Sequence, residues 1–324
     1  MQRSVRRIVM LGYPGAQILD ITGPLEVFAR TSRWLRDHRR LTYDAYQVEL
    51  VAPRAGWFAT SGGLRLEAAC SYSKSGKAHT LLIAGGIGYR DLLTDRALLK
   101  WIGAQPSRVV RLGSICTGAL VLGAAGVLRA KRATTHWAYF DRLREAAPGV
   151  EVDRDAIFVR SGNVYTSAGV TTGMDMALAM VEADWGKATA LAVAQELVMF
   201  LKRPGGQSQF SRHLAAQQRD DVFGALELWM LDHLDADLSV ETLARRASMS
   251  PRHFARLFKQ RLGTTPAAYV RRIRVEEARR QIEGGSARVK HVARSSGFSD
   301  DQHMRRAYKR LLGVTPAEYR SRFN

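Results

Sequence analysis

The chain has 324 residues, 46% of them hydrophobic and 24% charged, so it is long enough for two domains and has an ordinary globular composition. Its net charge is +19, and residues 239–324 hold 20 Lys/Arg against 7 Asp/Glu, which predicts a polyanionic partner for that segment. No apolar run approaches the roughly 20 residues that span a bilayer, and two distant cysteines exclude a disulfide framework or zinc spacing. We therefore expect a cytoplasmic protein that needs no membrane, metal or other cofactor.

The first two hundred residues alternate between strand-like and helix-like segments. The strand-like segments are near-continuous apolar runs, as expected of strands covered on both faces, and lie at 8–13, 46–52, 80–84, 109–115 and 164–167. The helical segments lie between and after them, at 25–31, 118–125, 137–146, 173–183 and 188–201. This alternation predicts an α/β sandwich with a flavodoxin-like, largely parallel sheet for residues 1–201.

One strand-to-helix corner in this domain carries a reactive residue type. Residues 109–115 run directly into Cys116 and Thr117 and then into a helix, so the cysteine is expected at a helix N-terminus. Such a position lowers the pKa of a thiol and can hold an anion. A cysteine at a turn is more often only a small buried side chain, so spacing alone leaves a structural role and a functional role both open.

Four further residues are expected at the same edge of the sheet. Gly85 and Gly86 follow the strand at 80–84 and could supply backbone N–H donors beside the cysteine. Asp20 and His136 flank other strand ends and could reach the same place, although a histidine there can equally be a structural hydrogen-bonding residue. Because ligands of open α/β sheets bind at the carboxyl ends of the strands, these residues form a candidate pocket with Cys116.

Residues 202–221 interrupt the pattern with a polar stretch rich in turn formers, and we place the interdomain linker there. The remainder, 222–324, is predicted to be entirely helical. It contains an internal repeat, since residues 257–269 and 307–319 share seven of thirteen aligned positions. The repeat predicts a duplicated helical unit.

The first copy has the pattern of a helix-turn-helix unit. Ser239 can cap a first helix, and Pro251 suits the first position of a second one. The apolar back of that second helix comprises Phe254, Leu257, Phe258 and Leu262. Its front comprises Arg252, His253, Arg256, Lys259 and Gln260. A helix with an apolar back and a basic, hydrogen-bonding front suits the major groove of DNA.

The second copy repeats this layout. Ser299 and Gln302 have the spacing of a capping box at the start of its recognition helix. The side chains expected to point inward are Met304, Ala307, Tyr308 and Leu311. Those expected to face DNA are Gln302, Arg305, Arg306 and Lys309. Asp300 and Asp301 would repel phosphate and Gln302 would be occupied by capping, so we expect the first copy to make more base-specific contacts.

A single helix at 266–283 is predicted to join the two copies. Eighteen residues rise about 27 Å, and adjacent major grooves on one face of DNA lie about 34 Å apart, so such a helix could hold two readers roughly one turn apart. A charge run alone would favour surface arginines on an ordinary helical bundle. Duplication, turn residues and charge placement together favour double-stranded DNA as the partner.

Both halves resemble known families. Residues 222–324 resemble the AraC/XylS transcription regulators, on Gly297–Ser299 and Gly313–Tyr319, with Met304 where that family usually has Phe. Residues 5–200 resemble the ThiJ/PfpI branch of the class I glutamine amidotransferase-like fold, on Cys116 and on Asp20 ahead of Gly23, and on 133–137. Enzymes of that superfamily use the elbow cysteine as nucleophile beside an acidic residue.

The departure from that superfamily is also informative. True glutamine amidotransferases add a His-x-Glu dyad downstream, and residues 167–172 lack it, which argues against release of ammonia from glutamine. The two halves together resemble the GlxA family of regulators, whose first domain is taken to be a sensor or dimerisation module. The resemblance implies a homodimer, a small effector derived from an amine or amino acid, and RNA polymerase as a candidate further partner.

Two other functions stay open at this point. The chain could be a ThiJ/PfpI-type cysteine enzyme, amidase- or hydratase-like, that also binds DNA; Cys116 would then be the candidate nucleophile, and Asp20 or His136 would handle protons. It could also be an architectural DNA binder with little sequence preference, which would show steep salt dependence without a strongly favoured site.

Overall fold

The computed structural model describes residues 5–199, 201, 222–283 and 289–320. The chain divides into two compact units, Met1–Arg203 and Pro204–Asn324. The linker expected at 202–221 lies outside the described residues. Within the described ranges, no helix is long and apolar enough to cross a membrane.

The first unit is built on a seven-stranded sheet with the order β10-β11-β7-β6-β1-β2-β5. Neighbouring strands are parallel except β10 and β11, which are antiparallel. The strands are β1 (Arg6–Leu11), β2 (Tyr46–Ala52), β5 (Cys70–Ser71), β6 (Thr80–Ile83), β7 (Arg111–Ile115), β10 (Phe158–Ser161) and β11 (Val164–Ser167). The largely parallel α/β fold predicted from the alternating segments is therefore confirmed.

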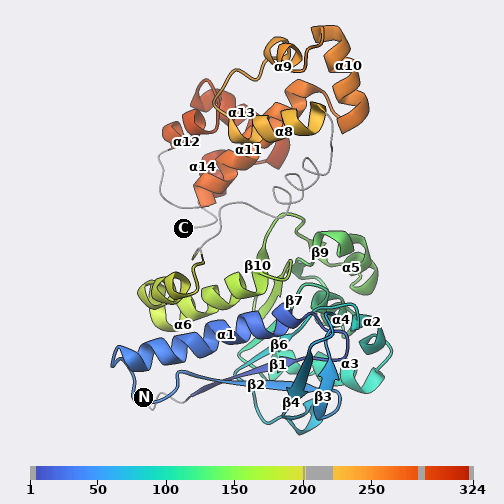
Figure 1. The fold of residues 1–324 in the computed structure, drawn as a ribbon, viewed down its shortest axis with the longest axis vertical. Coiled ribbons are helices and arrows are strands. Elements are labelled where there is room, and N and C mark those ends of the chain that lie inside the picture. Colours follow the sequence, from blue (N-terminus) through green and yellow to red (C-terminus); the bar gives the residue numbers. More distant parts are fainter. Residues whose placement is uncertain (1–4, 200, 202–221, 284–288, 321–324) are drawn as a thin grey trace. The chain divides into compact units, whose positions relative to one another are not determined.

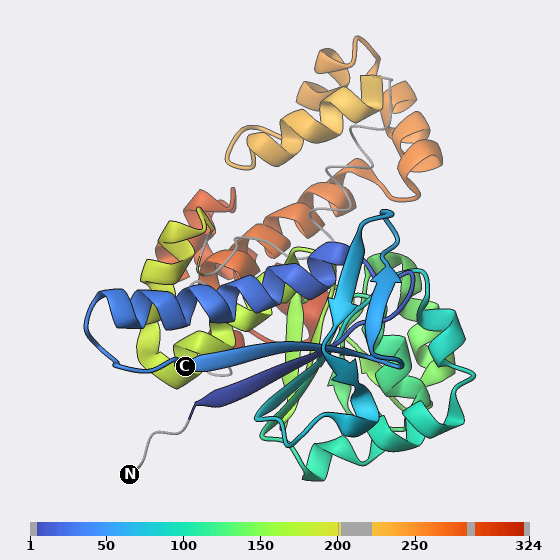
Figure 2. The ribbon, with the colours of Figure 1, turned by 60° about the horizontal axis from the view of Figure 1, so that its bottom comes forward.

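Helices cover both faces of this sheet, which is why its central strands are mostly apolar and are buried along most of their length. The helices α1 (Ile18–Asp37) and α6 (Thr172–Glu196) pack together over one face, and α3 (Arg96–Gly103), α4 (Gly118–Ala124) and α5 (Phe140–Ala146) cover the other (Figures 1 and 2). The short elements around them are α2 (Tyr89–Leu92), η1 (Tyr72–Lys74), η2 (Gln105–Ser107) and η3 (Trp137–Tyr139).

Two of the expected helices have other bounds than predicted, and the helices α2 and α3 were not expected from the sequence. Helix α1 begins at Ile18, not at residue 25, and contains Pro24 in its second turn. Helix α6 joins the segments expected at 173–183 and 188–201, and they meet at Gly186, whose φ of 83° breaks the helical path. On the sheet side, α6 is anchored because the buried Asp184 accepts hydrogen bonds from Arg111 (2.8 Å) and from the Tyr46 hydroxyl (2.6 Å).

Some of the smaller elements were not expected from the sequence. They are the hairpin of β3 (Gly56–Ala59) and β4 (Arg65–Ala68), the parallel pair β8 (Arg132–Ala133) and β9 (Glu151–Val152), and the edge strand β10. These strands have between two and four residues, too few for apolar alternation to mark them. The hairpin lies beside the loop that follows β1, because the Gly15 amide donates to Ala59 O (2.9 Å).

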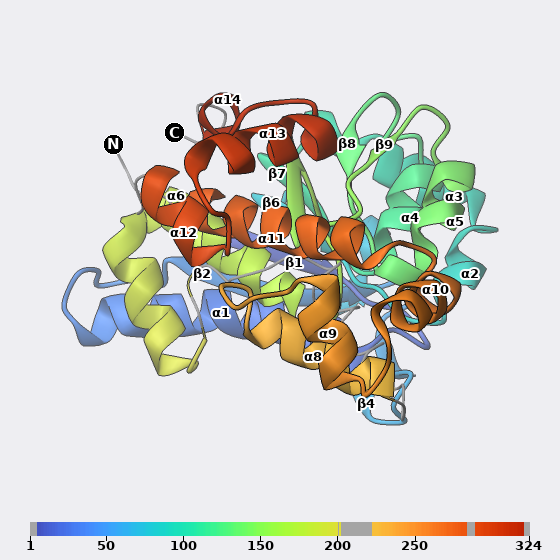
Figure 3. The same ribbon diagram turned by 90° about the horizontal axis from the view of Figure 1, so that it is seen from above.

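The described part of the second unit is all helical (Figure 3). Its helices are α8 (Val222–Asp232), α9 (Val240–Arg246), α10 (Pro251–Leu262), α11 (Pro266–Glu283), α12 (Val289–Ser295), α13 (Asp301–Leu312) and α14 (Pro316–Arg320). Helix α11 has the bounds predicted from the sequence. It contributes Ile273 and its neighbours to one core, around α9 and α10, and Ala278 and its neighbours to a second, around α12 and α13.

Candidate functional site

The first recognition helix, α10, has the local structure that its sequence predicts. Ser250 caps it by accepting the His253 amide on Oγ (3.4 Å), and Pro251 follows at the first helical position. Phe254 and Phe258 are fully buried, while Leu257 and Leu262 are partly buried against the same core. The side chains of the opposite face are all exposed: Arg252, His253, Arg256, Lys259 and Gln260.

The second recognition helix, α13, is capped differently from the prediction. Asp300 is the N-cap, and its Oδ1 accepts the His303 amide at 2.6 Å. The capping box of Ser299 with Gln302 is therefore wrong, because the backbone path makes Asp300, one residue further on, the N-cap. Gln302 is exposed and makes no side-chain hydrogen bond to any residue that the structure describes, so its amide can reach a base.

The rest of α13 follows the expected division, with one exception. Met304, Ala307 and Tyr308 are buried, whereas Leu311 is 44% exposed and Leu312 packs into the core in its place. Arg305, Arg306 and Lys309 are exposed, as expected, and Arg310 is exposed as well. Unlike them, Asp301 is acidic, and it forms an ion pair with one of these side chains, Arg305, at 3.5 Å.

A close contact joins the two helix-turn-helix copies. Gly297, in the turn between α12 and α13, has a φ of 77°, and a Cβ on it would lie 1.8 Å from Leu234 O, between α8 and α9. Arg274 of α11 donates to the same carbonyl at 2.9 Å and to Ala236 O at 2.9 Å. The turn of the second copy is therefore packed against the first copy, which fixes the spacing of α10 and α13.

The cysteine elbow of the first unit has a strained backbone. Cys116 directly follows β7 and has a φ of 51°, which is uncommon for a residue other than glycine. Strand β11 and the loop after β8 hold this conformation, since the Cys116 amide donates to Ser167 O (3.0 Å) and the Thr135 hydroxyl donates to Cys116 O (2.8 Å). The side chain is 7% exposed. The elbow is thus rigid and nearly closed to solvent.

Asp20 lies beside the elbow, as predicted, but the two glycine amides are already engaged. The Gly85 amide donates to Asp20 Oδ2 at 3.0 Å, and the Gly86 amide donates to Thr117 Oγ1 at 2.9 Å. Contrary to the expectation, neither N–H group points freely at a ligand. Asp20 is completely buried, and its Oδ1 atom has no hydrogen-bond partner among the described residues.

Burial determines the protonation of both acidic groups at the elbow. It raises the pKa of Asp20 to about 7, against the opposing effect of the Gly85 amide. It raises the pKa of the Cys116 thiol to about 12, and the charge of Asp20 adds to the increase. The expected lowering of the thiol pKa is therefore wrong, because burial outweighs the N-terminus of the seven-residue helix α4.

His136 lies at the same edge but does not complete a catalytic set. It caps η3, where its Nδ1 accepts the Ala138 amide at 3.3 Å, and burial lowers its pKa. Its ring lies near Gly169, just after β11. Within the described ranges it makes no hydrogen bond to Asp20 or Cys116, and no group of three metal-binding side chains occurs. The structure thus brings Asp20, Gly85, Cys116 and Thr117 into contact and leaves His136 beside them.

These features define a protein class: an α/β domain with a buried cysteine elbow, followed by a duplicated helix-turn-helix domain. A model of the DJ-1/PfpI family matches residues 6–183, and a helix-turn-helix domain model matches residues 243–322. The chain belongs to the DJ-1/PfpI family and carries an AraC-type helix-turn-helix domain, the organisation of GlxA-type regulators.

Individual relatives agree with this assignment. The chain is 30% identical to the HTH-type transcriptional regulator GlxA of Rhizobium meliloti over 78% of this chain and 78% of that protein. It is 36% identical to isonitrile hydratase of Pseudomonas putida over 59% of this chain and 77% of that protein. A solved ThiJ/PfpI family protein from Pseudomonas syringae aligns with a TM-score of 0.54 and 27% identity, over 62% of this chain and 78% of that one. The first-unit fold therefore occurs both in regulators and in an enzyme.

Proposed function

We propose that the protein is a cytoplasmic, sequence-specific transcription regulator that binds double-stranded DNA through α10 and α13. The observation that carries this proposal is the paired arrangement of two twelve-residue helices, each with a buried apolar back and an exposed basic face, in the two copies joined by α11. The regulator relative supports it. RNA polymerase is a candidate further partner of the DNA-bound form.

Fluorescence anisotropy with labelled duplexes tests this function. A regulator should prefer its operator, sought first in the DNA upstream of its own gene and neighbouring operons, over unrelated duplex by about a thousandfold or more at physiological salt. An architectural DNA binder would instead bind all duplexes within a few-fold, with equally steep salt dependence. Equal affinity for all duplexes would rule out a sequence-specific regulator, whereas absence of DNA binding would rule out both a regulator and an architectural DNA binder.

We further propose that the first unit is the dimerisation and effector-binding module. The effector site would comprise Asp20, Gly85, Gly86, Cys116, Thr117 and His136. The buried carboxylate of Asp20, with one oxygen unpartnered among the described residues, would suit a cationic amine. The adjoining Leu19, Ile87 and Trp137 are exposed apolar residues that suit the body of a ligand or a second subunit.

A thermal-shift screen of small amines and amino acids tests the effector site, because a ligand that binds only the folded state raises its melting temperature. The shift should disappear in Asp20→Asn and Cys116→Ala. An inducer response that survives both changes in a reporter assay would show that the effector binds elsewhere. Sedimentation of the full chain tests the dimer separately.

The isonitrile hydratase relative favours a second candidate function, a cysteine-dependent hydratase or amidase. The strained elbow at Cys116 supports it, but the raised pKa of the thiol opposes it, since the thiolate is the nucleophile. Alkylation by iodoacetamide across pH separates the two. A regulator with this buried thiol should react slowly until strongly alkaline pH, whereas fast alkylation at neutral pH together with turnover of an isonitrile would favour the enzyme.

A further inference from the structure

The first unit contains a cavity of about 460 Å³ that is distinct from the cysteine elbow. It lies towards the amino ends of the central strands, because its walls precede β6 and β7, whereas Cys116 follows the carboxyl end of β7. Its volume falls in the range of roughly 300–1,000 Å³ that is usual for sites of small molecules. The cavity is thus large enough for an organic ligand at the opposite edge of the sheet.

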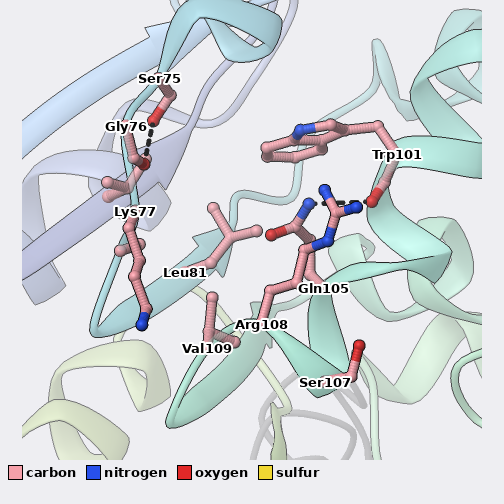
Figure 4. Close-up of a pocket in the computed structure, with 11 residues that line it drawn as sticks. Ser75, Gly76, Lys77, Leu81, Trp101, Gln105, Ser107, Arg108 and Val109 are labelled. Atoms are coloured by element: carbon pink, nitrogen blue, oxygen red, sulfur yellow. Dashed lines mark hydrogen bonds between the residues drawn. The ribbon is translucent and has the colours of Figure 1, made fainter.

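The floor of the cavity is apolar and its walls come from two separate segments. Leu81 and Val109 lie between the walls, with Ser75 to Lys77 on one side and Trp101, Gln105 and Arg108 on the other (Figure 4). Gln105 is 6% exposed, and its Nε2 donates to Trp101 O at 3.0 Å, which holds that wall in place. Leu81 and Val109 are only 1% and 8% exposed, so the half-buried Trp101 indole offers the main contact surface for the apolar body of a ligand.

The charged residues that line the cavity are both basic. Lys77 and Arg108 are exposed, one on each wall, and neither forms an ion pair with a residue that the structure describes. The nearby Arg7 is different, because its Nε donates to the Glu49 carboxylate at 2.9 Å and its charge is thereby balanced. The mouth of the cavity therefore carries two unbalanced positive charges above an apolar floor, and no acidic residue lines it.

We propose that this cavity binds a small organic anion with an aromatic or branched aliphatic body and one carboxylate. The body would pack mainly on the Trp101 indole, above Leu81 and Val109, and the carboxylate would accept hydrogen bonds from Lys77 and Arg108. A zwitterionic amino acid fits less well, because its ammonium group would face the same two cations. The site is separate from the effector pocket proposed at the elbow and does not depend on it.

Isothermal titration calorimetry of the full chain with 4-phenylbutyrate tests the proposal. Two analogues isolate the contributions: 4-phenylbutyramide keeps the ring without the charge, and butyrate keeps the charge without the ring. Both should bind at least about tenfold more weakly than 4-phenylbutyrate. The double variant Lys77→Gln/Arg108→Gln should lose about tenfold or more in affinity, and it should fold normally because both side chains are exposed.

The control variant Arg40→Gln/Arg129→Gln removes the same charge from exposed positions elsewhere in the first unit and should bind as the wild type does. Asp20→Asn should also leave the affinity unchanged. The proposal is overturned if 4-phenylbutyrate does not saturate in the low millimolar range, or if the amide binds equally well. It is likewise overturned if the Lys77/Arg108 variant binds normally, which would place the ligand on another basic surface, or if Asp20→Asn abolishes binding, which would place it at the elbow.

Discussion

Polar groups are buried at the cysteine elbow of the first unit and exposed on the recognition helices of the second unit. At the elbow, Asp20 and Cys116 are buried, and the amides of Gly85 and Gly86 are already bonded within the protein. On α10, the side chains of Arg252, Arg256 and Lys259 are exposed and form no ion pair with a described residue. The elbow is closed and its amides are bonded within the protein, whereas α10 exposes its basic side chains to solvent.

This difference distinguishes a surface that can bind a partner directly from a site that must first rearrange. The exposed basic side chains of α10 can contact a DNA phosphate or the edge of a base without a rearrangement of the protein. Such a surface is expected where DNA is found by diffusion and electrostatic attraction. The elbow can bind only a ligand that replaces existing internal contacts and repays the burial of Asp20. A closed site of this kind suits a sensor, because a ligand that binds there must change the conformation of the protein. Such a change is what can alter the behaviour of a distant part of the chain.

The largest loss of stability from a single substitution is expected where the elbow is most tightly packed. A Cβ on Gly85 would lie 2.5 Å from Asp20 Oδ2 and 2.8 Å from Cys116 Cβ, so Gly85→Ala should cost about 3 kcal/mol of unfolding free energy. Tryptophan fluorescence in urea measures it, because five of the six tryptophans belong to the first unit. Gly62→Ala, which meets open space, should cost less than about 0.5 kcal/mol. Equal costs for both variants would contradict a closed elbow.

On the open face, the effect should fall on binding and spare stability. Arg252→Gln/Arg256→Gln should weaken DNA binding by about ten- to a hundredfold and lower the salt dependence by about one unit of slope per lost phosphate contact. The unfolding free energy should stay within about 0.5 kcal/mol. Anisotropy titrations at several salt concentrations measure both binding quantities, with Arg40→Gln/Arg129→Gln as the charge-matched control. A loss of stability that parallels the loss of affinity would mean that these arginines hold the fold together.

The buried carboxylate predicts a pH dependence of stability. The folded-state pKa of Asp20 is about 7, above the unfolded value of about 3.9, so the folded protein binds this proton more tightly. The tighter binding of this proton adds on the order of 4 kcal/mol to the free energy of unfolding below about pH 4. This stabilisation is lost as the pH rises to about 7. Asp20→Asn should flatten this part of the stability profile, measured by urea unfolding at each pH. Asp37→Asn, at an exposed position, should leave it unchanged, and an unaltered slope in Asp20→Asn would argue against a buried acid.

The smallest expected difference lies between the two recognition helices. Arg305 is partly engaged by Asp301 at 3.5 Å, whereas among the described residues the polar partner of Arg256 is the neighbouring His253 ring at 3.2 Å. Arg256→Ala should therefore relax sequence preference more than Arg305→Ala, by about 1 kcal/mol at the affected base pair. Because Gln302 is not occupied by capping, its amide is free to contact a base, and the difference should be modest. The reverse order in a competition assay with mutated sites would overturn this ranking.

Local signals in the sequence were enough for much of the fold. Pro266 marks the start of α11, and the apolar runs mark the central strands, because both features act within one element. The cap of α13 was misassigned because Ser299 and Asp300 are both good N-cap residues, and only the backbone path decides between them.

The chemistry of the sites depends on contacts between distant segments. The pKa of Cys116 follows from burial by elements far away in the sequence, which no local motif reports. The cavity was missed for the same reason, since its walls at 75–78 and 101–109 meet only after the sheet has formed. Family resemblance located the elbow correctly but could not show that its amides are occupied.

We propose that α11 holds two DNA-reading helices about one turn of the DNA helix apart. The most direct test is selection of binding sites from a random duplex library by the full chain, followed by sequencing. We expect two blocks of preferred base sequence with centres about 10 base pairs apart. In Arg256→Ala, one block should lose its sequence preference while the other keeps it. A single preferred block, or enrichment without any preferred sequence, would contradict it.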